Sequence, residues 1–330
     1  MPQTINNGPT GVQFTGNDSI DGLLWGWQWS SSDFTFRFPE FAAEYQGYSQ
    51  VNDFAPMNVT QQNQLLEFAL NNLSAFTNIT WTYDSNFGGG NIRFANAGVI
   101  DSGDGNGPHF PGFGPSHRES SAEANPPSPQ FPSYAIGDNW FSVGLYAEPV
   151  LGSFQYAAGL LHEVGHALGL KHGHTDQDVV DANGNVLFTA PALPAAEDSQ
   201  NYSVMTYKQY EGQVLGGGAI GSADYPWTYM MNDVAALQHL YGANFTTANV
   251  GDTTYSFDNS TGQLTIDTFE FSAPYRGKVF ATMWDGGGND TYDFSNHSNA
   301  QTIDLNPGEW MTFSQSQLAN LNDGSGNNAI

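Results

Sequence analysis

A run of eleven residues places three histidines, His162, His166 and His172, at fixed intervals. Glu163 follows the first histidine and Gly169 lies between the second and the third, so the pattern is H-E-x-x-H-x-x-G-x-x-H. On a helix, residues four apart lie on one face, so His162 and His166 can bind one metal ion. Gly169 can end the helix in a left-handed cap, after which the reversed chain can bring in His172. Three neutral imidazoles and one open position make up a catalytic zinc site.

The alternative is that these histidines are ordinary core residues. A lone histidine on an apolar helix face is most often a hydrogen-bonded core residue, and H-E-x-x-H strings also arise in helices by chance. Here five specified positions agree in register, and three of them are histidine. The metal-site interpretation is therefore preferred.

A second stretch, residues 201–207, supports the metal site independently and reads N-Y-S-V-M-T-Y. An extended histidine motif followed by a methionine-containing turn is the signature of metzincins. With Tyr207 two residues after Met205, the stretch resembles the serralysin branch of peptidase family M10, which consists of secreted bacterial zinc endopeptidases. The resemblance implies that Met205 forms an apolar floor beneath the three histidines and that Tyr207 is an extra, displaceable zinc ligand. Taken alone, either residue would be interpreted as an ordinary core residue.

The balance of charges limits the classes of partner. The chain has 33 Asp and Glu against 7 Lys and Arg, a net charge of −26, whereas nucleic acids and anionic membranes bind basic patches. We therefore expect neither as a partner, and no apolar run approaches the roughly 18 residues of a membrane span. Hydrophobic residues at 39% and aromatic residues at 14% exclude a disordered chain. The sequence has no cysteine, and calcium is the other common stabiliser of secreted proteins.

The N-terminal residues lack the basic and then apolar layout of a signal peptide. On its own, this would suggest a cytoplasmic protein. Serralysin-like proteases, however, leave the cell through a one-step exporter that reads a C-terminal signal, so the resemblance implies a secreted, extracellular protein. We expect a monomer that acts on polypeptide substrates.

The spacing of apolar residues predicts an α+β fold, because alternation indicates strands and a helical period indicates helices. The resemblance implies a metzincin protease domain, with a twisted mixed sheet, a zinc-binding helix and a C-terminal subdomain after the third histidine. In metzincins an edge strand pairs with the substrate backbone, and residues 133–136 are the candidate. Strands are expected at 34–38, 78–83, 91–95, 131–136 and 138–142. Helices are expected at 61–73 with Thr60 as N-cap, from 153 or 154 through the histidine motif, and from Pro226 to Gly242.

Residues 1–20 are polar and are expected to be a flexible lead-in. The resemblance implies a catalytic domain at 21–245 and a calcium-binding β segment at 246–330. An insertion from about 98 to 131, rich in Gly and Pro, is either a lid near the cleft or a mobile excursion. It contains two histidines, His109 and His117, that we do not assign as metal ligands because neither has a spaced partner. The chain stops where serralysins enter an RTX-type β-roll, so it is either a natural short form or a truncated polypeptide.

The C-terminal part carries the string W-D-G-G-G-N-D-T-Y-D-F-S at residues 284–295. Two aspartates around three glycines offer the carboxylate and carbonyl oxygens that calcium prefers. The string resembles a serralysin calcium turn that also uses carbonyls of an upstream R-x-G-D-T segment, which is N-V-G-D-T at 249–253 in this chain. The resemblance assigns one calcium ion to Asn249, Gly251, Thr253, Asp285, Gly287 and Asp290, and a second one to Gly288, although Ser325 and Asn327 stand where the family has threonine and glutamate.

The motif and the resemblance together predict hydrolysis of internal peptide bonds in extended polypeptides. Zinc on three histidines lowers the pKa of a water toward neutrality and polarises the scissile carbonyl. Glu163, beside the open position, is the expected general base, and Tyr207 is expected to hydrogen-bond the oxyanion. Two rival functions remain. One is a catalytically silent metal-binding or adhesive module on a metzincin scaffold, and the other is a structural surface protein that is stabilised by calcium and binds zinc incidentally. The intact ligands, base and tyrosine favour the enzyme.

Overall fold

The computed structural model describes residues 8–47, 54–97, 122–142, 146, 148–215, 223–246 and 249–321. Its helices and strands form a mixed α+β fold, as expected. Within these ranges, no helix has the length and apolar character needed to cross a membrane. Several sequence features lie outside the described residues, namely 1–7, the insertion up to residue 121 with His109 and His117, the glycines at 216–218, and Ser325 and Asn327.

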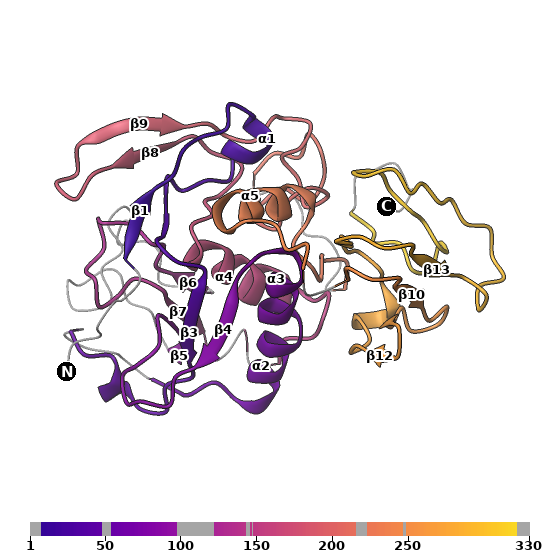
Figure 1. Ribbon diagram of the computed structural model, residues 1–330, viewed down its shortest axis with the longest axis horizontal. Helices are drawn as coiled ribbons and strands as arrows, with labels where there is room; N and C mark the ends of the chain where they lie inside the picture. Colours follow the sequence, from indigo (N-terminus) through magenta and orange to yellow (C-terminus); the bar gives the residue numbers. More distant parts are fainter. Residues whose placement is uncertain are drawn as a thin grey trace.

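The main sheet has five strands in the order β4-β3-β5-β7-β6 (Figure 1). All neighbours are parallel except β6, which runs antiparallel to β7. The predicted strands near 34–38, 78–83, 91–95 and 138–142 are confirmed. Every residue of β5 is buried, as expected for a parallel strand covered on both faces. The strands are β3 (Asp33–Arg37), β4 (Thr80–Tyr83), β5 (Ile92–Ala97), β6 (Ala122–Ala124) and β7 (Asp138–Ser142).

The predicted strand at 131–136, which includes the candidate edge at 133–136, is wrong, because this segment folds into tight turns before β7. The Ala135 amide donates to the Pro132 carbonyl at 2.9 Å, and the Asp138 amide donates to the Ala135 carbonyl at 3.1 Å. These local bonds use the backbone groups that a sheet partner would need. The edge of the described sheet beside β7 is instead β6, which lies in the range assigned to the insertion.

Two helical segments pack beside the sheet (Figure 1). The predicted N-cap Thr60 is wrong, because the first segment is capped by Asn58. The Asn58 side chain accepts a hydrogen bond from the Gln61 amide, and the Gln61 side chain accepts one from the Asn58 amide, both at 2.9 Å. This reciprocal capping box fixes the helix start two residues earlier. The segments are α2 (Val59–Gln64), the π-helical η2 (Leu65–Leu70) and α3 (Asn71–Phe76), and then the π-helical η3 (Gln155–Leu161) and α4 (His162–Ala167).

The end of α4 is fixed by Gly169, whose φ of 102° is in the left-handed region. The Leu170 amide donates to the Gly165 carbonyl and the Gly169 amide to the His166 carbonyl, both at 2.9 Å. These two bonds form a Schellman motif that satisfies the last carbonyls of the helix. The tryptophan Trp29 donates to the Ala167 carbonyl at 2.8 Å. The expected helix stop before His172 is therefore present.

The helix expected from Pro226 begins five residues later, as α5 (Met231–Tyr241). The Asp233 carboxylate accepts the Met230 amide at 2.9 Å and so caps the helix there. Upstream, the Trp227 amide donates to the Phe280 carbonyl at 3.0 Å, which ties this stretch to the C-terminal part of the chain. The expected end at Gly242 is confirmed.

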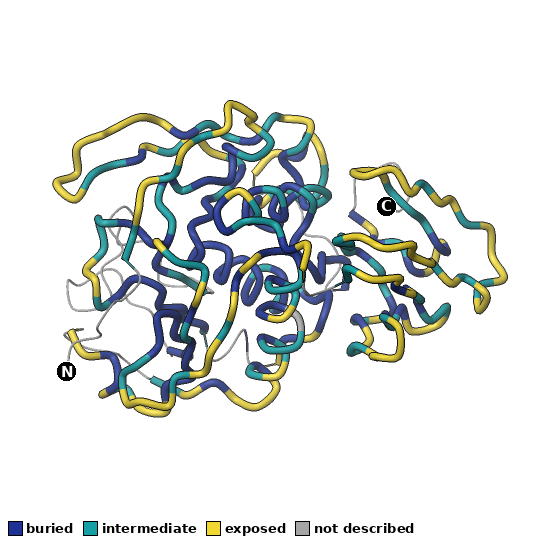
Figure 2. The backbone as a smooth tube through the Cα atoms, in the orientation of Figure 1, coloured by how far each residue is buried: buried dark blue, intermediate teal, exposed yellow. Residues whose placement is uncertain are grey.

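The remaining elements flank this core. β1, which lies within the range expected to be a lead-in, pairs antiparallel with β2. β8 pairs antiparallel with β9. Residues 249–321 form a smaller lobe around the sheet β12-β11-β10-β13 (Figure 1). Buried backbone is dense around α4 and sparse in this lobe (Figure 2). These elements are β1 (Pro9–Gly11), α1 (Asp18–Asp21), β2 (Trp27–Trp29), η1 (Ala42–Glu44), β8 (Gln177–Val180), β9 (Val186–Ala190), β10 (Thr254–Phe257), β11 (Leu264–Ile266), β12 (Phe269–Glu270), η4 (Tyr275–Gly277) and β13 (Thr291–Asp293).

Candidate metal centre

The three motif histidines converge on one point. The Nε2 atoms of His162 and His166 are 3.0 Å apart, and each lies 3.1 Å from Nε2 of His172. In the part of the chain that the structure describes, this trio is the one group of His and acidic side chains with the spacing of a metal site. Helix α4 supplies two of the rings, and the chain reversal at Gly169 supplies the third.

Hydrogen bonds on the far side of two rings set their tautomers. Nδ1 of His162 lies 2.8 Å from the Val204 carbonyl, and Nδ1 of His166 lies 2.8 Å from the Leu170 carbonyl. A carbonyl only accepts, so both Nδ1 atoms carry the proton and both Nε2 atoms present a lone pair to the centre. This is the orientation in which metal-bound histidines are usually held.

All three rings are neutral near pH 7. Burial lowers the pKa of His162 to about 4, and burial together with the neighbouring His162 lowers that of His166 to about 3. Burial and the two other histidines hold the pKa of His172 well below its usual range. Neutral imidazole is the form that binds a metal ion.

The residues present fit a zinc ion. Lone pairs that face one another at 3.0–3.1 Å repel unless a cation lies between them. A tetrahedral ion with Zn–N bonds of about 2.0–2.1 Å would place the nitrogens about 3.3 Å apart. The observed separation requires an outward shift of only a few tenths of an ångström, so the trio is nearly ready to receive zinc.

The methionine turn lies directly against α4. Met205 is fully buried, and a Cβ added at Gly165 would meet its sulfur at 2.6 Å. Gly165 lies between the two histidines of the helix, so the thioether packs against α4 at this position. The Gly173 amide donates to the Met205 carbonyl at 3.1 Å, and this bond links the turn to the loop of the third histidine.

Asp233 on α5 anchors the same turn, a role that the sequence did not reveal. Its carboxylate accepts the Ser203 hydroxyl at 2.6 Å and the Val204 amide at 2.8 Å. The Ser203 hydroxyl in turn accepts the Met205 amide at 2.9 Å. Burial raises the pKa of Asp233 to about 7, although the bonds from Ser203, Val204 and Met230 lower it.

Glu163 is buried under the edge strand β6. It accepts a backbone hydrogen bond from Ala124, and its pKa is raised well above its usual range by burial and then by the charge of Glu123. A raised pKa suits a carboxylate that must take up a proton, while a bound cation would act in the opposite direction. Neither β6 nor Glu123 stood out in the sequence, because Ala-Glu-Ala carries no strand signal.

Tyr207 faces the third histidine, with its hydroxyl 2.9 Å from Nε2 of His172. The residue as a whole is 56% exposed, while its ring stacks over His162 with 5.7 Å between centroids. Burial, Glu163 and Glu123 raise the phenol pKa far above its usual range. A fourth histidine, His174, packs on Tyr207 with 4.7 Å between centroids, and the H-x-H spacing after the motif was the only sequence signal for it.

The two segments expected to bind calcium lie side by side. The Gly286 amide donates to the Asn249 carbonyl at 2.7 Å, and a Cβ added at Gly288 would lie 2.3 Å from the Gly251 carbonyl oxygen. The two strands that follow, β10 and β13, pair in parallel from Thr254 and Thr291 onward. This approach brings carbonyls of one segment to the glycines of the other.

The carboxylates of this loop already have partners within the protein. Asp285 accepts the Tyr255 hydroxyl at 2.7 Å and the Gly287 amide at 2.8 Å. Asp290 accepts the Thr253 amide at 2.9 Å. Carboxylates together with nearby carbonyls form the type of donor set that calcium uses.

Comparison with known proteins agrees with this geometry. The family model described as Peptidase M10 serralysin C terminal matches residues 243–322. Serralysin B of Dickeya chrysanthemi is 31% identical over 287 residues, which are 85% of this chain and 52% of the relative. Metallopeptidase AprA of Pseudomonas marginalis is 29% identical over 307 residues, 92% and 56% of the two chains. Serralysin of Proteus mirabilis is 38% identical over 178 residues, 53% and 33% of the two chains.

The class that the matches define is that of the metallopeptidases. The chain is similar to the serralysins and related to the M10 peptidases, so the resemblance seen in the sequence is confirmed. The chain spans about half the length of Serralysin B and of AprA, and about a third of the Proteus mirabilis serralysin.

Proposed function

We propose that this chain is a secreted zinc-dependent endopeptidase that hydrolyses internal peptide bonds of extended polypeptides. The observation that carries the proposal is the convergence of three Nε2 atoms at 3.0–3.1 Å, with two of the rings locked by carbonyls. Names of relatives such as metallopeptidase and serralysin support it. One catalytic zinc ion would be held by His162, His166 and His172.

The proposed mechanism divides proton transfer and charge stabilisation between two side chains. Zinc, when bound, lowers the pKa of a water and polarises the scissile carbonyl. Glu163 takes the proton of the attacking water and delivers it to the leaving amine. The Tyr207 hydroxyl, held at His172, turns to hydrogen-bond the oxygen that becomes negative. Met205 supports the ligands from below and takes no part in proton transfer.

Strand β6 is the proposed edge strand for pairing with the substrate backbone, in place of residues 133–136. It is one of the two edge strands of the described sheet, the one next to β7, and its Ala124 amide donates a hydrogen bond to Glu163. An extended peptide that pairs with this edge would pass the general base.

The C-terminal lobe is proposed to bind one or more calcium ions. Asn249, Gly251 and Thr253 would contribute carbonyls, and Asp285 and Asp290 carboxylates, with Gly287 and Gly288 as further backbone donors. Calcium here would stabilise the lobe without entering the reaction. Residues 21–245 and 246–330 are proposed as the catalytic and calcium-binding parts of a monomer.

The test is cleavage of unfolded casein by the purified chain at constant calcium. Glu163→Ala should reduce cleavage by about 10²- to 10⁴-fold, because it removes the general base, while zinc content stays at one per chain. Glu270→Ala, at an exposed glutamate on β12, is the matched control and should cleave like wild type. Removal of zinc by a chelator should abolish cleavage, and added zinc should restore it.

A folded, zinc-loaded wild type that cleaves neither casein nor other unfolded proteins would contradict the proposal. That outcome would favour the catalytically silent metal-binding module instead. Equal activity of wild type and Glu163→Ala would remove Glu163 from the mechanism.

A further inference from the structure

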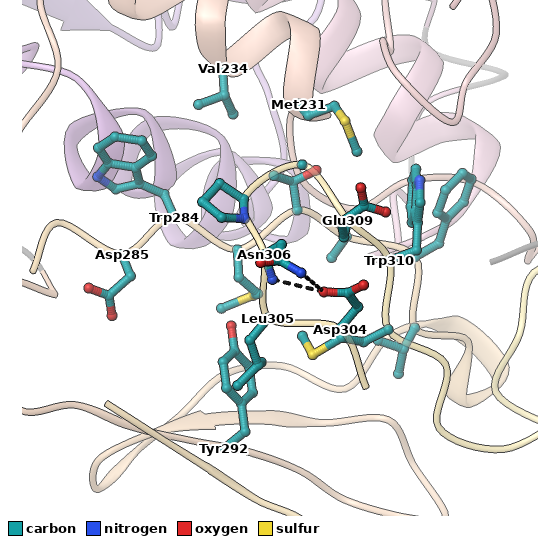
Figure 3. Close-up of a pocket in the computed structure, with 18 of the residues that line it drawn as sticks. Met231, Val234, Trp284, Asp285, Tyr292, Asp304, Leu305, Asn306, Glu309 and Trp310 are labelled. Atoms are coloured by element: carbon teal, nitrogen blue, oxygen red, sulfur yellow. Dashed lines mark hydrogen bonds between the residues drawn. The ribbon is translucent and has the colours of Figure 1, made fainter. Parts of the chain in front are cut away.

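A groove separate from the histidine site lies between α5 and the chain from Val279 to Leu318 (Figure 3). Its volume is about 670 Å³, within the range of about 300–1,000 Å³ that ligand sites occupy. None of the motif histidines, Glu163 or Tyr207 lines it. The proposed peptidase function therefore leaves this groove unexplained.

The floor of the groove is apolar and adaptable. Three methionines, Met231, Met283 and Met311, line it together with Trp284 and Trp310. Methionine side chains are flexible and polarisable, so they can fit apolar groups of varied shape. Tryptophan is the residue type most enriched in binding hot spots.

One apolar side chain that lines the groove is exposed to solvent. Leu305 is 66% exposed and projects into the groove beside Tyr292 (Figure 3). The backbone turn that presents it is fixed, because Asp304 accepts hydrogen bonds from the Asn306 amide at 3.0 Å and from the Asn306 side chain at 2.7 Å. An exposed leucine on a fixed turn, next to an apolar floor, favours an occupant with apolar side chains.

The charges of the groove have one sign. Its acidic lining residues are Asp285, Asp290, Asp304 and Glu309, and none of its lining residues, all of them described, is Lys, Arg or His. Bound calcium would neutralise the first two. Asp304 and Glu309 would then remain as anionic groups beside the apolar floor, and this arrangement attracts a cationic, apolar partner and repels an acidic one.

We propose that this groove binds a basic, amphipathic segment of a polypeptide. Its apolar side chains enter the floor of methionine and tryptophan, and its lysine or arginine side chains face Asp304 and Glu309. The site is a docking surface distinct from the histidine centre. It would select polypeptides by a basic segment away from the bond that is cut.

The test uses a fluorescent synthetic peptide of about 16 residues, with leucines at helical spacing and lysines elsewhere. Titration of the full chain should show saturable one-to-one binding that weakens as salt rises, because part of the attraction is between exposed charges. All proteins carry Glu163→Gln, so that the peptide is not cut and binding is measured independently of peptidase activity. A peptide with glutamate at each lysine position should not bind.

Three variants separate groove binding from general attraction to a chain of charge −26. Asp304→Asn with Glu309→Gln should weaken binding about tenfold, and Asp304→Asn keeps an acceptor for the Asn306 turn. Trp310→Ala should weaken it at least as much. The control Glu40→Gln with Glu270→Gln removes the same charge at exposed sites outside the groove and should leave binding unchanged.

Equal loss in the control pair and in the groove pair would overturn the proposal, because binding would then follow net charge alone. Unchanged affinity in Trp310→Ala would overturn it too. Unfolding curves of each variant verify that the fold is intact.

Discussion

The histidine centre and the calcium loop are both candidate metal sites, but they are built in different ways. In the histidine centre the donors are side chains, and the far nitrogens of His162 and His166 are held by the carbonyls of Val204 and Leu170. The near nitrogens of these two rings face each other and Nε2 of His172. This site is preorganised, since the helix and its cap fix the rings before metal arrives.

In the calcium loop, by contrast, the donors are largely backbone carbonyls, and the two carboxylates have protein partners already. Asp285 bonds Tyr255, and Asp290 bonds the Thr253 amide. An ion must compete with these bonds, and the glycines allow the loop to adjust. We therefore expect zinc binding to depend sharply on single side chains, and calcium binding to depend on them only moderately.

The largest effect is expected for loss of a histidine ligand. His166→Ala should weaken zinc binding by well over the 10- to 100-fold that follows from losing an outer-shell partner, and cleavage should fall to background. Metal analysis after gel filtration measures this directly. Asp290→Ala serves as the comparison and should keep one zinc per chain; loss of zinc in both would erase the contrast between the sites.

The next effect concerns Tyr207. Tyr207→Phe removes the hydroxyl near His172 and should lower kcat about 10²- to 10³-fold, the usual cost of one donor to a developing oxyanion. KM and zinc content should change little. Tyr83→Phe, at an exposed tyrosine of β4, is the control, and equal kcat in wild type and Tyr207→Phe would exclude this role.

Asp233 should make stability depend on pH. Its folded pKa of about 7 lies above the unfolded value of 3.8, so between these values only the folded chain keeps the proton, and its contribution is lost as pH rises toward 7. One pKa unit corresponds to about 1.4 kcal/mol. The unfolding free energy of wild type minus that of Asp233→Asn should therefore drop by roughly 2–3 kcal/mol from pH 5 to pH 8. Zinc-saturated samples in urea test this, and a constant difference would contradict it.

A smaller loss is expected at the helix stop. Gly169→Ala forces a side chain into a left-handed φ and toward the Trp27 carbonyl, 2.6 Å from the new Cβ. The expected cost is about 1–3 kcal/mol of unfolding free energy, together with weaker zinc binding, because His172 follows. Gly212 has a similar φ of 80°, but a Cβ added there would have open space around it, so Gly212→Ala should cost less. Equal costs would mean that backbone strain, and not the contact with the Trp27 carbonyl, destabilises Gly169→Ala.

The smallest effect is expected in the calcium loop. Asp290→Asn keeps an acceptor for the Thr253 amide and removes one charge. A tenfold loss in calcium affinity would reduce calcium-linked stabilisation by about 1.4 kcal/mol. Thermal unfolding at several calcium concentrations measures it. If the stability of the variant no longer depended on calcium at all, calcium binding would depend on one side chain as strongly as zinc binding does in the histidine centre.

The sequence predicted the parts of the molecule that depend on short-range geometry. Two histidines four apart, a glycine stop and a third histidine follow from helix geometry alone, and alternating residues gave four of the five predicted strands. The strand predicted at 131–136 was wrong because local backbone hydrogen bonds from Pro132 onward form turns there. Strand β6 was missed because Ala-Glu-Ala pairs with β7 through tertiary context.

The same limit applies to the site. Asp233 is separated from Val204 by 29 residues, so its role in the methionine turn depends on how α5 packs. Glu123 reaches Glu163 only through the pairing of β6. Such contacts join distant segments and leave no periodic pattern in the sequence.

The central claim is that His162, His166 and His172 bind one zinc ion, and zinc K-edge X-ray absorption tests it most directly. The spectrum of the purified, zinc-loaded chain should show three imidazole nitrogens at about 2.0–2.1 Å and at least one oxygen. His172→Ala should lose one imidazole from this shell. A shell with fewer than three imidazoles in the wild type, or one unchanged by His172→Ala, would contradict the assignment.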